Sequence, residues 1–471
     1  MKGLRMMGML FALLCLVCGA MAENNEWPIP KFKDVSVHDP SIIRAEDGTY
    51  YIFGSHMAAA KSTDLIQWKM ISRDAGSGCT LVENVQEQMK EALSYAKTTT
   101  FWAPDVQKLG DGRYYLYYCT CKGDSPLSML GVAVSDSPEG PYENLGVFLK
   151  SGYPGYNATT LPNVVDPCVF FDKENNLWMV YGSYSGGIYI LQMDPDTGFP
   201  LEGQNYGKKL LGKNHARIEG PYILYSPDTD YYYLFLSFGG LNADDGYNIR
   251  VCRSKNPDGP YEDALGQSMI DCGGRPGTFF NDPDYEGYGV KLLGGYCFEN
   301  VESDTNQFRL AYRSPGHNSA YYDAETGRYF LVFHTRFAGS GESFKVRVHQ
   351  MVMNENGWPV VLPQRFAGET IEAPENKTGL YKVILHERDI NKTEHTSRLV
   401  TLNGDGTVSG DLSGVWNCDA NGLFRCELDG VSYAGVMTTA LDSKESVWVS
   451  VFTALDETGA ALWGSHAAHE N

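Results

Sequence analysis

The chain alternates short apolar runs with tight polar turns, and one such pattern recurs five times. In each copy a polar residue precedes a short apolar strand, then comes a turn rich in Asp, Asn and Gly, and then a strand rich in Tyr, Phe and Leu. The polar residues that anchor the copies are Asp39, Asp105, Asp166, Glu219 and His317. Further strand-like stretches between the copies, such as 130–134 and 249–252, bring each unit to four strands. This repeat predicts a five-bladed β-propeller.

The segment before the repeat has a different pattern. Two basic residues and an apolar run that ends at Ala22 predict a signal peptide over residues 1–22. We therefore expect a secreted or periplasmic protein. A lipid anchor on Cys18 is the less favoured alternative, because Val17 stands where a lipoprotein signal has a small residue.

Two domains are expected after the signal peptide. The aromatic repeat fills residues 23–368, which form the predicted propeller. Residues 369–471 carry short alternating strands with Gly-Asp turns, which predict a small C-terminal β-barrel or sandwich. The predicted fold class is therefore all-β. Packing against the propeller is the simpler role for the second domain, and binding of polysaccharide is the alternative.

Composition excludes several function classes. Apolar residues make up 43% of the 471 residues and charged residues 20%, so the chain can bury large cores. A formal net charge of -20 would repel a phosphate backbone, which excludes nucleic acid as a partner. No apolar run after residue 22 is long enough to span a bilayer. We expect a monomer whose cysteines are mostly buried thiols.

Three of the repeat anchors, Asp39, Asp166 and Glu219, are the candidate catalytic residues. The innermost strands of a propeller line its central channel, so residues at their starts converge although they are far apart in sequence. Hydrolysis of a glycosidic bond needs one carboxylic acid to protonate the leaving oxygen and one carboxylate to activate water. The pattern therefore favours a glycoside hydrolase. A carboxylate before proline also often caps a turn, and a non-catalytic carbohydrate-binding propeller stays an alternative.

Five motifs, in order along the chain, resemble the arabinan-degrading members of glycoside hydrolase family 43. The motifs are Val37-His38-Asp39-Pro40-Ser41, Trp102-Ala103-Pro104-Asp105-Val106, Asn163-Val164-Val165-Asp166-Pro167, Ile218-Glu219-Gly220-Pro221-Tyr222 and Gly316-His317-Asn318-Ser319. The resemblance implies a five-bladed propeller with a C-terminal β domain that cleaves internal α-1,5-L-arabinofuranosidic bonds of arabinan, a side chain of pectin, with inversion. It implies Asp39 as general base, Glu219 as general acid, and Asp166 as the residue that tunes the acid and orients the sugar. An exo-acting α-L-arabinofuranosidase or β-xylosidase on the same fold is the alternative.

Other positions are candidates for binding substrate or metal. Trp102 and the neighbouring Phe101 lie at a blade entrance, where an aromatic face can stack on an arabinofuranose ring. The resemblance implies that Asn163 and Ser183 form hydrogen bonds to arabinan or arabino-oligosaccharides. It also implies a calcium or similar divalent ion in the channel, held by His317 and waters, although calcium usually prefers oxygen ligands.

Overall fold

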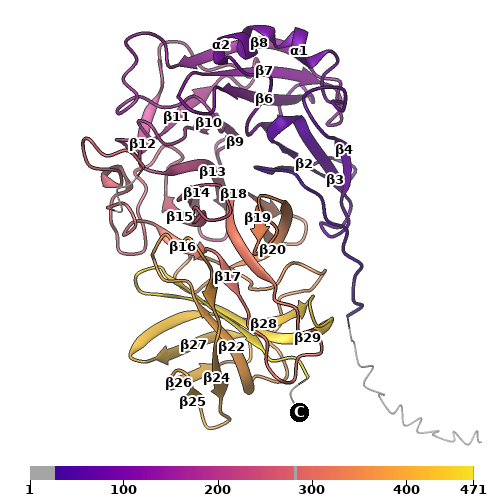
Figure 1. The fold of residues 1–471 in the computed structure, drawn as a ribbon, viewed down its shortest axis with the longest axis vertical. Coiled ribbons are helices and arrows are strands. Elements are labelled where there is room, and N and C mark those ends of the chain that lie inside the picture. The colour runs from indigo at the N-terminus through magenta and orange to yellow at the C-terminus, as the bar shows by residue number, and fades with distance from the viewer. Residues whose placement is uncertain (1–26, 281–283, 470–471) are drawn as a thin grey trace, which may run out of the picture.

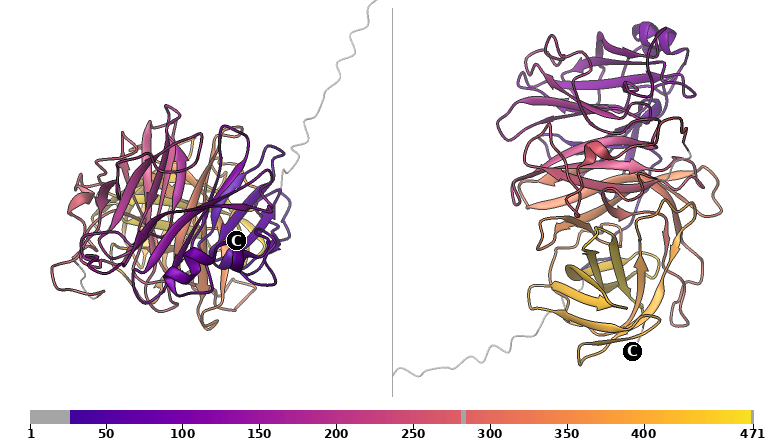
Figure 2. Two further views of the ribbon diagram at one scale, coloured as in Figure 1. Left: turned by 90° about the horizontal axis from the view of Figure 1, so that it is seen from above. Right: turned by 90° about the vertical axis from the view of Figure 1, so that its left-hand side faces the viewer.

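The computed structural model describes residues 27–280 and 284–469. The predicted signal peptide, residues 1–22, lies outside the described residues. The described chain forms a ring of five sheets and a closed barrel, which lie one above the other in Figure 1 and in the right-hand view of Figure 2. The prediction of an all-β fold, with a five-bladed propeller and a small C-terminal β domain, is confirmed.

The first four propeller blades are antiparallel sheets of strands that follow one another in sequence, and the fifth differs by one parallel strand at its edge. The first two blades are β1 (Ser41–Arg44), β2 (Tyr50–Gly54), β3 (Ala58–Ser62) and β4 (Lys69–Ser72), then β5 (Asp105–Lys108), β6 (Tyr114–Cys121), β7 (Ser128–Ser135) and β8 (Glu143–Ser151). The next two are β9 (Cys168–Phe171), β10 (Leu177–Tyr181), β11 (Ile188–Met193) and β12 (Lys208–Leu211), then β13 (Ile218–Ser226), β14 (Tyr231–Phe238), β15 (Asn248–Ser254) and β16 (Val290–Leu293). The fifth contains β17 (Tyr296–Cys297), β18 (Ala311–Asp323), β19 (Arg328–Phe337), β20 (Phe344–Met353) and β21 (Pro359–Val361), with β23 (His395–Thr396) added at its edge.

Blade strands are buried on both sides because neighbouring blades pack against both faces. All residues of β6 and β7, for example, are buried. Aromatic and β-branched side chains, which favour strands, fill the space between blades, and Tyr117 and Tyr181 belong to one cluster between the second and third blades. The helical segments of the described residues are short: α1 (Val85–Gln88), α2 (Lys90–Ala96), η1 (Ser55–Met57) and η2 (Met269–Asp271).

The C-terminal part is a closed barrel rather than a sandwich. Its strands are β22 (Gly379–Leu385), β24 (Arg398–Leu402), β25 (Thr407–Gly410), β26 (Gly414–Cys418), β27 (Leu423–Leu428), β28 (Val431–Asp442), β29 (Val447–Asp456) and β30 (Ala461–His466). Side chains such as Phe424 and Leu462 form the barrel core. Trp463 of the barrel shares a second cluster with Tyr296 and Tyr233 of the propeller, so the two domains have a common apolar interface.

Two further findings concern the state of the cysteines and the length of the helices. The cysteines of the described residues are free thiols, most of them buried, as the composition predicts. No helix in the described part of the chain has the length and apolar character needed to cross a membrane.

Candidate active site

The inner ends of all five blades meet around one cavity of about 240 Å³. Its wall includes Asp39, which precedes β1, and Asp166, which precedes β9. Glu219 in β13 and His317 in β18 contribute from the fourth and fifth blades, and Trp102, just before β5, contributes from the second. The structure therefore brings together the predicted anchors that are farthest apart in sequence.

The backbone is distorted at three of these positions. Asp39, Asp166 and His317 have φ of 55°, 58° and 43°, in the left-handed region. A residue with a side chain adopts this region at a cost on the order of 1–3 kcal/mol, and such outliers cluster at functional sites. Glu219 lies at a bulge instead, because the pairing of β13 with β14 shifts register between Glu219 and Tyr222. All four anchor positions thus depart from regular strand geometry where they line the cavity.

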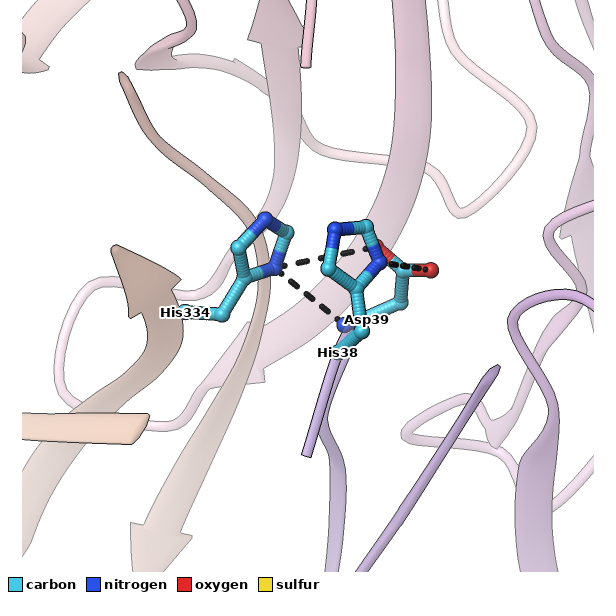
Figure 3. A group of neighbouring side chains, drawn as sticks. All are labelled: His38, Asp39 and His334. Atoms are coloured by element: carbon cyan, nitrogen blue, oxygen red, sulfur yellow. Dashed lines mark hydrogen bonds and ion pairs between the residues drawn. The ribbon is translucent and has the colours of Figure 1, made fainter. Parts of the chain in front are cut away.

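Asp39 is buried among three histidines, two of which are drawn in Figure 3. His38 Nδ1 lies 2.8 Å from Asp39 Oδ2, and His317 Nδ1 lies 3.2 Å from Oδ1. Ser55 donates its hydroxyl to Oδ2, and the Asp39 N–H donates to His334 Nδ1 at 3.2 Å. Burial would raise the pKa of Asp39, but the electrostatic influence of the neighbouring imidazoles of His38 and His317 outweighs it and holds this pKa well below its usual value. A carboxylate kept ionised in this way is suited to act as a base.

Glu219 accepts hydrogen bonds at both carboxylate oxygens. Ser183 Oγ donates to Oε2 at 2.7 Å, and the Tyr247 hydroxyl donates to Oε1. Burial, and then the charge of Glu219, raise the pKa of Tyr247 well above its usual value, so this hydroxyl stays a donor. The two hydroxyls fix the position of the Glu219 carboxyl in the cavity wall.

Asp166 interacts with both other acids. Its Oδ2 accepts a hydrogen bond from the N–H of Gly220 at 3.3 Å, directly after Glu219 in the chain. Burial, and then the charges of Glu219 and Asp39, raise the pKa of Asp166 well above its usual value. The lowered pKa of Asp39 favours its ionised carboxylate, and the raised pKa of Asp166 favours its protonated carboxyl. Acid–base hydrolysis uses one carboxylate as base, the state that the surroundings of Asp39 favour.

The predicted sugar-binding residues divide into two groups. Trp102, Asn163 and Ser183 line the cavity. Phe101 does not, because its side chain is only 1% exposed and packs edge-on against Tyr118 in the core between the first two blades. Neighbouring side chains of an extended segment point in opposite directions, so Trp102 faces the cavity while Phe101 faces the core. The expected sugar contact of Phe101 is corrected accordingly.

Several residues of the site were not foreseen from the sequence. His38 contacts Asp39, Tyr247 contacts Glu219, and Phe279 lines the cavity from the long connection between β15 and β16. The sequence could have indicated His38, because it belongs to the same motif as Asp39. No sequence feature indicated Tyr247 or Phe279, because they lie in connections outside the repeated pattern.

The surroundings of His317 would suit an ion that keeps most of its water ligands better than an ion enclosed by protein ligands. Its Nδ1 faces Asp39, and within residues 27–280 and 284–469 no side chain forms a hydrogen bond with Nε2. A calcium ion here would take one imidazole nitrogen and fill the rest of its shell with water, for which the cavity has room. The other cluster of possible ligands, His38, Asp39 and His334, is rich in nitrogen and suits calcium poorly.

Comparison with known proteins gives the family. The model of glycosyl hydrolases family 43 matches residues 32–283, and a model described as a C-terminal lipocalin-like domain matches residues 363–464. The chain belongs to glycosyl hydrolases family 43. The second match agrees with the closed barrel, the architecture that gives lipocalins their shape.

Several members of family 43 are similar over nearly the whole chain. An extracellular endo-α-(1→5)-L-arabinanase of Bacillus subtilis is 54% identical over 93% of this chain and 94% of its own length. An extracellular endo-α-(1→5)-L-arabinanase of Thermotoga petrophila is 46% identical over 98% of this chain and 99% of its own. The crystal structure of a family 43 glycoside hydrolase from Bacillus licheniformis has a TM-score of 0.90 at 53% identity, and covers 93% of this chain and 100% of that one.

Proposed function

We propose that this chain hydrolyses internal α-1,5-L-arabinofuranosidic bonds of arabinan with inversion of configuration. The observation that carries the proposal is the meeting of Asp39, Asp166 and Glu219 in one cavity. It is supported by two relatives, named as endo-arabinanases, that match at 54% and 46% identity over more than nine-tenths of both lengths.

In the proposed reaction Glu219 protonates the glycosidic oxygen that leaves, and Asp39 takes a proton from the water that attacks the anomeric carbon. The bond between that carbon and the leaving oxygen breaks while the water oxygen bonds from the opposite face, which inverts the configuration. Asp39 ends protonated and Glu219 ionised, and solvent resets both. The hydroxyls of Ser183 and Tyr247 stabilise the negative charge that Glu219 acquires. Asp166, whose raised pKa favours the protonated carboxyl, lies in the cavity wall where it can orient the sugar.

The size of the early products tests internal cleavage. With debranched arabinan, an endo-acting enzyme releases oligosaccharides of several lengths before L-arabinose accumulates. Release of L-arabinose alone would favour the exo-acting α-L-arabinofuranosidase, and hydrolysis of xylo-oligosaccharides in its place would favour the β-xylosidase. Measurement of the anomer formed first, by NMR during the reaction, tests inversion.

We also propose that His317 holds a calcium or similar divalent ion with most of its water shell. When bound, such an ion supplies positive charge near Asp39, which favours the ionised base. His317 would orient it through one nitrogen. The metal content of the wild-type protein and of His317→Ala, measured after dialysis, tests the site directly. Equal metal content in both proteins would contradict it.

We further propose that the chain is exported and works as a monomer. Arabinan is too large to enter a cell intact, the two relatives are named extracellular, and residues 1–22 have the pattern of a signal peptide. The mature protein should begin at Glu23, which N-terminal sequencing of the exported form checks, and light scattering gives its mass.

A further inference from the structure

A segment of the C-terminal domain leaves the barrel and lies against the propeller. Residues 386–397, called the strap here, connect β22 to β24 and contain β23. β23 pairs in parallel with β17 of the fifth blade, with His395 opposite Tyr296. Glu394 Oε1 lies 2.6 Å from a guanidinium nitrogen of Arg309. Backbone pairing and an ion pair thus anchor the strap on the propeller.

The strap also contacts the loop of residues 239–247, which joins β14 to β15. A Cβ placed on Gly239 or Gly246 would lie 3.1 or 3.0 Å from Ile390 Cγ2. These glycines have φ of 88° and 79°, which residues with a side chain rarely adopt. The close approach of Ile390 therefore depends on glycine at both ends of the loop.

A buried arginine forms a second link from the strap to the 239–247 loop. The guanidinium of Arg250 is fully buried and donates to Arg388 O at 2.8 Å in the strap. Arg250 Nε donates to Asn248 Oδ1 at 2.9 Å, and Asn248 Nδ2 donates to Gly246 O at 3.0 Å. The strap carbonyls help to solvate a charge that has no access to water, and this couples their position to that of Gly246.

The 239–247 loop in turn forms part of the active site. Leu241 lines the cavity, and Tyr247, next to Gly246, donates its hydroxyl to Glu219. A continuous series of contacts therefore runs from the barrel, through Ile390 and Arg250, to Glu219.

We propose that the strap is a positioning element of the active site, which packs Ile390 on the 239–247 loop and so holds Tyr247 in hydrogen-bond contact with Glu219. The inference rests on the proposed role of Glu219 as the acid. It gives the C-terminal barrel a part in catalysis that differs from both packing and polysaccharide binding. A strap that shifts lets Tyr247 withdraw, and the carboxylate formed by proton transfer then loses one of its two donors.

A double-mutant cycle of Ile390→Ala and Tyr247→Phe tests the inference through kcat/KM on debranched arabinan, measured across pH. Tyr247→Phe should lower kcat/KM by roughly tenfold or more and move the alkaline limb of the profile to higher pH, because the ionised carboxylate loses a donor. Ile390→Ala should produce the same shift with a smaller loss, because it displaces the Tyr247 hydroxyl instead of removing it. The double variant should be no worse than Tyr247→Phe alone, because the strap acts through Tyr247.

Val400→Ala is the matched control. It removes a buried aliphatic side chain from the barrel core, where Val400 is 1% exposed, and should lower stability without moving the pH profile. Ile390→Val replaces Ile390→Ala if the larger truncation does not fold. The inference is overturned if the Ile390 variants keep the wild-type profile, as Val400→Ala should, or if the losses multiply in the double variant. Full turnover by Glu219→Gln would instead overturn the proposed function.

Discussion

A buried carboxyl between the two domains makes the stability of this protein depend on pH. Glu369 lies between β21 and β22 and is fully buried. Its Oε2 accepts the N–H of Ala367 at 2.7 Å, whereas Oε1 has no partner among the described residues. Burial raises the pKa of Glu369 from 4.5 to about 7, although the hydrogen bond from Ala367 acts in the opposite direction.

The sign of the effect follows from this raised pKa. Between pH 4.5 and 7 the folded protein binds more protons at Glu369 than the unfolded chain, so the free energy of unfolding falls as pH rises. The slope is about 1.4 kcal/mol per pH unit, and the loss adds up to about 3 kcal/mol by pH 8. Glu369→Gln keeps an uncharged group of the same shape. The variant should exceed the wild type by less than about 1 kcal/mol at pH 5 and by about 3 kcal/mol at pH 8.

Urea unfolding followed by tryptophan fluorescence, at both pH values, measures this difference. Glu375→Gln, at an exposed position of the same connection, is the control and should leave the free energy of unfolding unchanged at both. A difference between Glu369→Gln and wild type that is equal at pH 5 and pH 8 would refute the reasoning, because it would show that the carboxyl does not titrate differently on unfolding.

Three further predictions concern the site, and a fourth concerns Asp105, which does not line the cavity. Glu219→Gln should lower kcat on arabinan by roughly a thousandfold, and much less on an aryl arabinofuranoside whose leaving group needs no proton; equal losses on both substrates would contradict its role as acid. His38→Asn removes an imidazole whose electrostatic interaction lowers the pKa of Asp39, so the acid limb of the pH profile should move to higher pH, and an unmoved limb would count against the contact. Trp102→Ala should raise KM more than it lowers kcat if the ring stacks on bound sugar, which steady-state kinetics on oligosaccharides decides. Asp105→Asn should lower the midpoint of thermal unfolding while kcat/KM per folded molecule stays within about twofold, and a large kinetic loss would show that this acid takes part in the chemistry.

The propeller and its cavity residues could be predicted because the same pattern recurs. The repeat identifies the strands of each blade. In a propeller, the inner strand of every blade starts at one central channel. Asp39, Asp166, Glu219 and His317 could therefore be placed together before any coordinates were known, and the cavity contains all four.

Contacts that depend on connections could not be predicted in this way. Tyr247 reaches Glu219 because the 239–247 loop lines the cavity, and nothing in its local sequence indicates that position. The strap contacts the loop across domains, through Ile390 and two glycines, and no periodic pattern links these positions. The direction of individual side chains was also not predictable. The adjacent aromatics Phe101 and Trp102 point to opposite sides at a blade entrance, and the sequence alone does not say which one faces the channel.

Asp105 shows why equivalent anchor positions have different roles. It begins the inner strand of the second blade, as the other acids stand at the starts of theirs, yet it does not line the cavity. One carboxylate oxygen accepts the Ser41 hydroxyl from the first blade, and the other accepts the Val169 N–H from the third. Both oxygens are thus engaged in joining neighbouring blades, whereas Asp39, whose contacts are largely with titratable imidazoles, opens to the cavity. What separates Asp105 from the other acids is therefore its place: its two oxygens join neighbouring blades away from the cavity, whereas Asp39, Asp166 and Glu219 lie in the cavity wall.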